Sequence, residues 1–149
     1  MARNRFTLAT TAEVALTTSL KTMLSITNAA NVRLAIRGFS VNFDGISSTA
    51  GSAEVILGIH SSSGTATAST LQKDLRGTTE ALGTTGVFNF SAEPSYTAYL
   101  RTYEINQMTG YERAFAPDEE IVLAGGERLG ILVRASSAVN ANGFITAEE

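Results

Sequence analysis

Apolar and polar residues alternate along most of the chain, which is the pattern of β-strands with one buried face. In "VRLAIRGFSVNF" the apolar positions of residues 32–36 share one face, and those of 39–43 continue it after a shift of phase at Gly38. A β-bulge at Gly38 accounts for the shift. Residues 53–60, "AEVILGIH", alternate in the same way. We expect these two strands to be antiparallel neighbours.

Shorter segments of the same kind lie on both sides of these strands. They are rich in threonine or aromatic residues, which pack well on a pleated surface. We expect strands at residues 6–10, 13–16, 21–28, 87–91, 96–105 and 144–149. Residues 120–134, "EIVLAGGERLGILVR", alternate on both sides of Gly125 and Gly126. This pattern predicts a β-hairpin closed by a glycine turn.

The segments between these strands predict loops. Residues 64–86 contain few large apolar side chains, which indicates a long excursion, and "TLQKDLRG" within it suits one or two helical turns ended at Gly77. We expect residues 106–117 to be a connecting loop. About eight short strands separated by turns predict an all-β fold, an antiparallel β-sandwich with jelly-roll topology. Residues 1–149 are expected to form one domain.

Composition narrows the classes of function. The chain has no cysteine, which excludes disulfides and thiolate metal sites. Its net charge of -3 comes without a basic stripe, so we expect no nucleic-acid partner. A hydrophobic content of 44% beside only 17% charged residues favours a subunit that lies against neighbours. The first residues lack the continuous apolar segment of a signal peptide, so we expect folding in the cytosol and no membrane partner.

Candidate catalytic chemistry centres on His60, the only histidine. Ser61, Ser62 and Ser63 follow it, so a Ser-His-acid triad is formally available, although the chain has no nucleophile-elbow motif and no identifiable acid partner. The alternative is that His60 ends a strand and faces away from Leu57 and Ile59 as a structural residue. One histidine without cysteine also argues against zinc. We therefore predict no enzyme, no catalytic residue and no cofactor.

Other polar residues suggest binding. The acidic run at residues 118–120 could hold calcium or could be a solvated strand entrance, and we predict no metal site. Arg128 and Arg134 could reach a carboxylate or a glycan. Four tyrosines could stack on sugars or contact a partner, or could simply straddle core and surface: Tyr96, Tyr99, Tyr103 and Tyr111. The glycines of "AGGERLG" lack both phosphate-loop patterns and fit turns better.

Two stretches of the chain resemble a known group of proteins. They are residues 51–75, with "SSSGTATASTLQKDL", and 110–149, with "GGERLG", "AVNANGFIT" and an acidic end. They resemble small β-rich virion proteins of tailed bacteriophages, of the head-decoration or cement kind, and the similarity covers about residues 32–149. The "GGERLG" segment also looks like the turn in trimeric jelly rolls of the tumour-necrosis-factor and complement-globular type.

The resemblance implies a jelly-roll subunit, a homotrimer, that sits on the outside of an icosahedral shell and binds the major capsid protein. Such a protein adds buried area across subunit boundaries, and many copies supply avidity. Residues 1–11 would then be an extended arm. Arg3 and Arg5 would pair with shell carboxylates, while Phe6 and Leu8 dock or add a strand. The alternative for this segment is a frayed terminus.

Two other classes of function stay open from the sequence. A glycan-binding or receptor-binding sandwich, on a phage tail for example, would use the tyrosines and residues 64–86. A hydrolase would depend on His60.

Overall fold

The computed structural model describes residues 4–44, 51–74 and 80–149, and these residues form thirteen strands and no helix. The strands are β1 (Arg5–Ala9), β2 (Val14–Leu16), β3 (Lys21–Thr27), β4 (Leu34–Phe43), β5 (Ser52–His60), β6 (Thr65–Ser69), β7 (Gln72–Lys73), β8 (Thr85–Ala92), β9 (Tyr96–Asn106), β10 (Tyr111–Ala114), β11 (Ile121–Leu123), β12 (Arg128–Ala135) and β13 (Val139–Glu148). In the described ranges, therefore, no helix could span a membrane.

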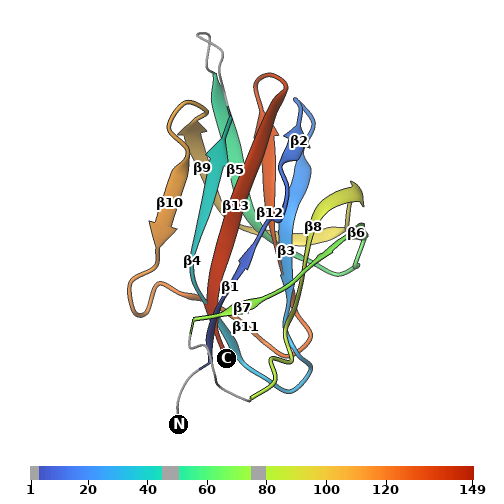
Figure 1. Ribbon diagram of the computed structural model, residues 1–149, viewed down its shortest axis with the longest axis vertical. Coiled ribbons are helices and arrows are strands. Elements are labelled where there is room, and N and C mark those ends of the chain that lie inside the picture. The colour runs from blue at the N-terminus through green and yellow to red at the C-terminus, as the bar shows by residue number, and fades with distance from the viewer. Residues whose placement is uncertain (1–3, 45–50, 75–79) are drawn as a thin grey trace.

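Two antiparallel sheets pack face to face (Figure 1). Sheet A has the strand order β10-β4-β13-β1-β7, and in addition β11 pairs with β4 and β2 pairs with β13. Sheet B has the order β6-β8-β3-β12-β5-β9. The prediction of an antiparallel β-sandwich is confirmed.

The strand pairing nests inward from the two ends of the chain. β1 pairs with β13, β3 with β12, β4 with both β10 and β11, and β5 with β9. This is the pattern of one long hairpin rolled into two sheets, which is a jelly roll. The predicted excursion contains two strands: β6 pairs with β8 at the edge of sheet B, and β7 extends sheet A beyond β1. β8 itself corresponds to the strand predicted at residues 87–91.

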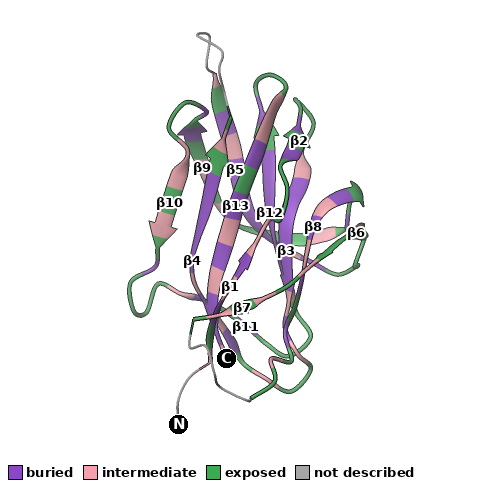
Figure 2. Ribbon diagram, viewed as in Figure 1, coloured by how far each residue is buried: buried purple, intermediate pink, exposed green. Residues whose placement is uncertain are grey.

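The core lies between the two sheets and is built by the alternation seen in the sequence. Burial alternates along β1 and along most of β13, whereas residues 38–41 of β4 and 129–133 of β12 are all buried, as Figure 2 shows along these strands. The largest fully buried side chains are Phe6, Phe39, Leu8, Leu16, Met23, Leu24, Ile26, Leu34, Ile36, Leu57, Leu123 and Leu129. Burying each contributes roughly 1.5–3 kcal/mol, so this set is the main stabilising term.

The bulge predicted in β4 is present. Thr146 lies opposite Gly38, whereas Ala147 lies opposite Ile36, so Arg37 is the extra residue. The bulge lets Ile36 and Phe39 both enter the core although they are three positions apart. It also turns the Arg37 side chain onto the outer face of sheet A.

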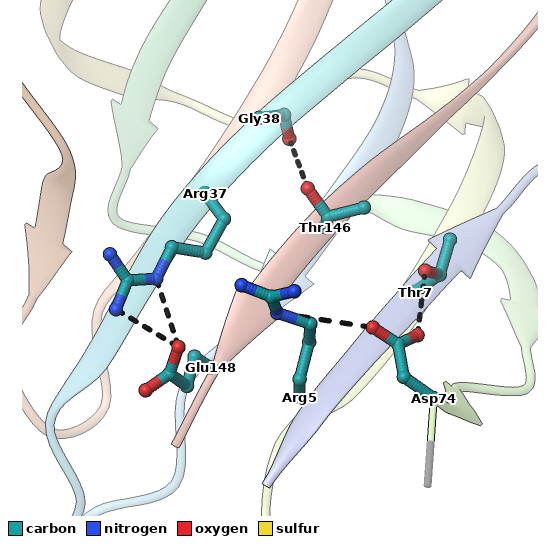
Figure 3. A network of polar contacts seen from close by, with 7 residues as sticks. All are labelled: Arg5, Thr7, Arg37, Gly38, Asp74, Thr146 and Glu148. Atoms are coloured by element: carbon teal, nitrogen blue, oxygen red, sulfur yellow. Dashed lines mark hydrogen bonds and ion pairs between the residues drawn. The ribbon is translucent and has the colours of Figure 1, made fainter. Parts of the chain in front are cut away.

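The outer face of sheet A carries two groups of ion pairs, and one of them includes Arg37 at the bulge (Figure 3). Arg37 donates to the Glu148 carboxylate, with Nη2 2.9 Å from Oε2, and it also pairs with Glu120. On β1, Arg5 and Thr7 both contact the Asp74 carboxylate, at 4.0 and 3.4 Å. These contacts join the last strand to β4, and the first strand to the end of β7.

The predicted hairpin at residues 120–134 is wrong. β11 pairs with β4 in sheet A, whereas β12 pairs with β3 and β5 in sheet B. The glycine turn is therefore a crossing between sheets, in which Gly126 has a φ of 80° and a Cβ atom at Gly125 would lie 1.9 Å from the Ala30 carbonyl oxygen. Alternation shows that each segment has a buried face, but it does not identify the partner strand.

Three further expectations about connections need correction. β4 and β5 lie in different sheets and are not neighbours. The described part of "TLQKDLRG" is not helical, because Gln72 and Lys73 form β7 against β1, and Gly77 lies outside the described residues. The predicted loop at 106–117 contains β10, which pairs with β4.

The expected N-terminal arm is also wrong for the described residues. β1 lies inside sheet A, between β13 and β7, as Figure 1 shows. The side chains of Phe6 and Leu8 are fully buried in the core and cannot dock on another protein. Arg5 faces outward beside Asp74, and Arg3 lies outside the described residues. Residues 6–8, "FTL", therefore belong to a core strand. The local sequence does not reveal this, because the partner strand β13 comes from the other end of the chain.

Candidate functional site

A serine and a histidine meet on the outer face of sheet B. His60 ends β5 and Ser25 lies in β3, with β12 between these two strands. The His60 Nε2 atom is 2.7 Å from Ser25 Oγ, and His60 Nδ1 is 2.6 Å from the Ser62 carbonyl oxygen. Because a carbonyl oxygen only accepts, Nδ1 carries the proton, and Nε2 accepts the Ser25 hydroxyl proton. This is the polarity of a Ser-His nucleophile pair, oriented by a backbone carbonyl instead of a carboxylate.

This pair is closed to a substrate. Ser25 is fully buried and His60 is only 3% exposed. The rings of Phe90 and Tyr96 pack on the imidazole, with centroids 6.4 and 5.3 Å away. Burial lowers the pKa of His60, and the charge of Arg128 lowers it further against the opposing effect of the bond to Ser62. The imidazole is therefore neutral at pH 7, and the geometry suits a structural residue.

Tyr96 lies over the outer face of sheet B because two glycines leave it room. A Cβ atom at Gly130 would lie 2.1 Å from the Tyr96 hydroxyl oxygen, and one at Gly58 would lie 2.7 Å from its ring. The hydroxyl is 2.8 Å from Thr22 Oγ1. Glu93 Oε2 in turn accepts from the Thr22 hydroxyl and from its backbone N–H. The segment at residues 93–96 is thus fastened over the serine and histidine.

This arrangement keeps the Tyr96 phenol protonated. Thr22 gives its single hydroxyl proton to the Glu93 carboxylate, so its oxygen accepts from the Tyr96 hydroxyl. Burial raises the pKa of Tyr96 strongly, and the nearby Glu93 charge raises it further. A buried, protonated phenol is a hydrogen-bond donor that holds a covering segment in place.

The four tyrosines proposed as one ligand or partner surface divide into two pairs. Tyr96 and Tyr99 contact each other on β9 with ring centroids 5.8 Å apart, and Tyr99 is 57% exposed. Tyr103 and Tyr111 contact each other at 5.4 Å, and both pack on the buried ring of Phe39. The second pair joins the edge strand β9 of sheet B to the edge strand β10 of sheet A.

The charged residues proposed as binding groups are mostly paired within the chain. Arg128 donates to the Ser61 carbonyl, and Arg134 pairs with Glu54. In the acidic run, Glu119 pairs with Arg113 and Glu120 pairs with Arg37. Among the residues that the structure describes, no group of three His, Cys, Asp or Glu side chains could hold a metal ion.

Two features of this region escaped the sequence analysis. Ser25 was not identified as the partner of His60, because it is 35 residues away and two strands distant. The sequence does contain one signal of a segment covering this face. Gly58 and Gly130 lie at outward positions of strands where a side chain is expected, and the Tyr96 ring packs against both. The second feature is the meeting of Arg101 and Arg113 above Phe115.

Comparison with known protein families, with curated proteins and with solved structures found no match to this chain.

Proposed function

We propose that this protein is a non-enzymatic structural subunit of a virion, a decoration or cement protein on the outer surface of a phage head. It binds the major capsid protein and strengthens contacts between capsid subunits. The proposal joins the resemblance of residues 32–149 to one structural observation, which is the free edge strand β9.

β9 has the features of an association surface. It is eleven residues long, and in the described structure it pairs only with β5. Its side chains Tyr99 and Leu100 are 57% and 44% exposed. Leu100 is also the extra residue of a bulge, because Gly58 lies opposite Tyr99 and Leu57 opposite Arg101. An edge strand offers unpaired N–H and C=O groups, and exposed apolar side chains beside them favour contact with another chain.

The proposed subunit associates with copies of itself, and the resemblance favours a trimer. Contacts along β9 would bury Tyr99 and Leu100 together with unpaired backbone groups. Many copies on one shell would then act together, so modest affinity at each contact would hold the layer in place.

The experiment compares attachment to purified heads that lack this protein. The test variant carries Tyr99→Ser and Leu100→Ser, and the control carries Val122→Ser, which alters an apolar residue of similar exposure on the other sheet. We expect the double variant to lose most attachment, measured by co-sedimentation, while its unfolding midpoint stays near that of the parent. Full attachment of the double variant, or equal loss in the control, would contradict a role for β9.

A further inference from the structure

Two arginines from the edges of both sheets meet above one aromatic ring. Arg101 comes from β9 in sheet B and Arg113 from β10 in sheet A. Their Cζ atoms lie 4.5 and 5.9 Å from the centroid of the Phe115 ring. Thr102, Tyr103 and Glu119 complete a depression of about 360 Å³, here called the arginine depression.

The charges in the arginine depression do not balance. Among the described residues, Glu119 is the only acidic group that lines it, and its Oε2 atom is 3.3 Å from Arg113 Nη2. Arg101 donates instead to the Glu119 backbone carbonyl. Two guanidinium groups therefore share one carboxylate, which leaves one net positive charge. The Phe115 ring attracts both cations, but this attraction does not neutralise them.

Donor groups in the arginine depression remain available to a ligand. A guanidinium has five N–H donors. In the described residues, Arg101 donates to the Glu119 carbonyl, and Arg113 bonds to the Glu119 carboxylate. Both guanidinium groups stay charged throughout the physiological pH range. The Arg101 and Arg113 side chains also lie against the Phe115 ring. They therefore have fewer conformations to lose when a ligand binds, which lowers the entropy cost of binding.

The neighbouring groups define the ligand. A guanidinium fork matches the two oxygens of a carboxylate. Thr102 and the half-buried Tyr103 also line the depression and carry hydroxyl groups, and its volume lies in the lower part of the range for small-molecule sites. We propose that the arginine depression binds a carboxylate-bearing sugar, of the type of glucuronate. This inference goes beyond the virion proposal and does not depend on it.

The test is a titration of the full chain with sodium glucuronate at constant ionic strength, followed by NMR. We expect saturable shifts at β9 and β10, with weaker binding of glucose, acetate and sulfate. Arg101→Gln and Arg113→Gln should each weaken glucuronate binding about tenfold or more, since each removes a charged hydrogen bond. Arg33→Gln removes an exposed positive charge outside the depression and should leave binding unchanged.

Several results would overturn this inference. Glucose binding as tightly as glucuronate would remove the role of the carboxylate, and sulfate binding equally well would show a general anion site. Equal weakening by Arg33→Gln would reduce the effect to net charge. If Arg113→Gln does not fold, Arg101→Lys decides, because it keeps the charge and loses the fork. Unchanged glucuronate binding by that variant would refute bidentate recognition.

Discussion

Substitution of Leu8 tests whether residues 5–9 form a core strand or an extended arm. The Leu8 side chain is fully buried, and a Cβ atom placed on Gly86 would lie only 2.1 Å from the Leu8 Cδ1 atom. Leu8 on sheet A therefore packs directly on the backbone of β8 in sheet B. Because Gly86 has no side chain to fill a void, we expect Leu8→Ala to cost about 3–5 kcal/mol, in the upper part of the range for such changes. A total stability of about 5–15 kcal/mol would fall severely.

The assay for Leu8→Ala is urea unfolding followed by circular dichroism. With a slope of about 2 kcal/mol per molar urea, the midpoint should fall by about 1.5–2.5 M. Thr7→Ala is the matched control, since Thr7 is the preceding residue and points outward to Asp74 at 3.4 Å. It should change stability by no more than about 1 kcal/mol. Gly86→Ala should destabilise the parent and partly rescue Leu8→Ala, because the new methyl group fills the vacated space.

Equal and small effects of Leu8→Ala and Thr7→Ala would refute this account of β1. They would mean that residues 5–9 do not form a strand of sheet A in solution, and they would favour the N-terminal arm instead. Failure of Gly86→Ala to couple with Leu8→Ala would show that the two residues are not in contact.

The covering segment on sheet B yields three further predictions. The pKa of His60 is lower in the folded protein, so the unfolded chain binds more protons near pH 6. The contribution of His60 to stability is therefore complete above about pH 6.5 and is lost as the pH falls toward the pKa of the folded state. His60→Gln should flatten this part of the pH profile of the urea midpoint, and an unchanged profile would contradict the prediction. Gly130→Ala should cost about 1–3 kcal/mol by displacing the Tyr96 hydroxyl, measured by thermal unfolding. Tyr96→Phe alone should cost about 0.5–1.5 kcal/mol, because the hydrogen bond to Thr22 is lost. It should also lessen the cost of Gly130→Ala, and strict additivity of the two changes would show that the Tyr96 hydroxyl is not the clashing group.

The sequence predicts the strands of this protein better than their partners. Alternation and one phase shift locate β4 and its bulge, because the side-chain direction within a strand is a local property. The same alternation in 120–134 does not reveal that β11 and β12 belong to different sheets. That choice depends on β4 and β3, far away in the chain. Register and sheet membership come from long-range packing, which a single segment does not encode.

In the candidate site, too, local features are predicted from the sequence and contacts between distant strands are not. The sequence interpretation of His60 as a strand end agrees with the structure, but its bond to Ser25 depends on the order β3-β12-β5. The sequence predicts the four tyrosines as one group, whereas the structure divides them into the pair Tyr96–Tyr99 and the pair Tyr103–Tyr111, with a bulge at Leu100 between the two parts of β9. The convergence of Arg101 and Arg113 requires two sheet edges to meet and has no signature in either segment.

The number of copies per particle tests the proposed virion role most directly. Virus particles are purified from a culture that produces this protein, and co-sedimenting copies are counted by quantitative mass spectrometry against the major capsid protein. We predict hundreds of copies per particle, as a layer over the shell requires. A handful of copies would place the protein at a tail or portal and contradict the decoration role, and complete absence from the particles would contradict any structural role in the virion.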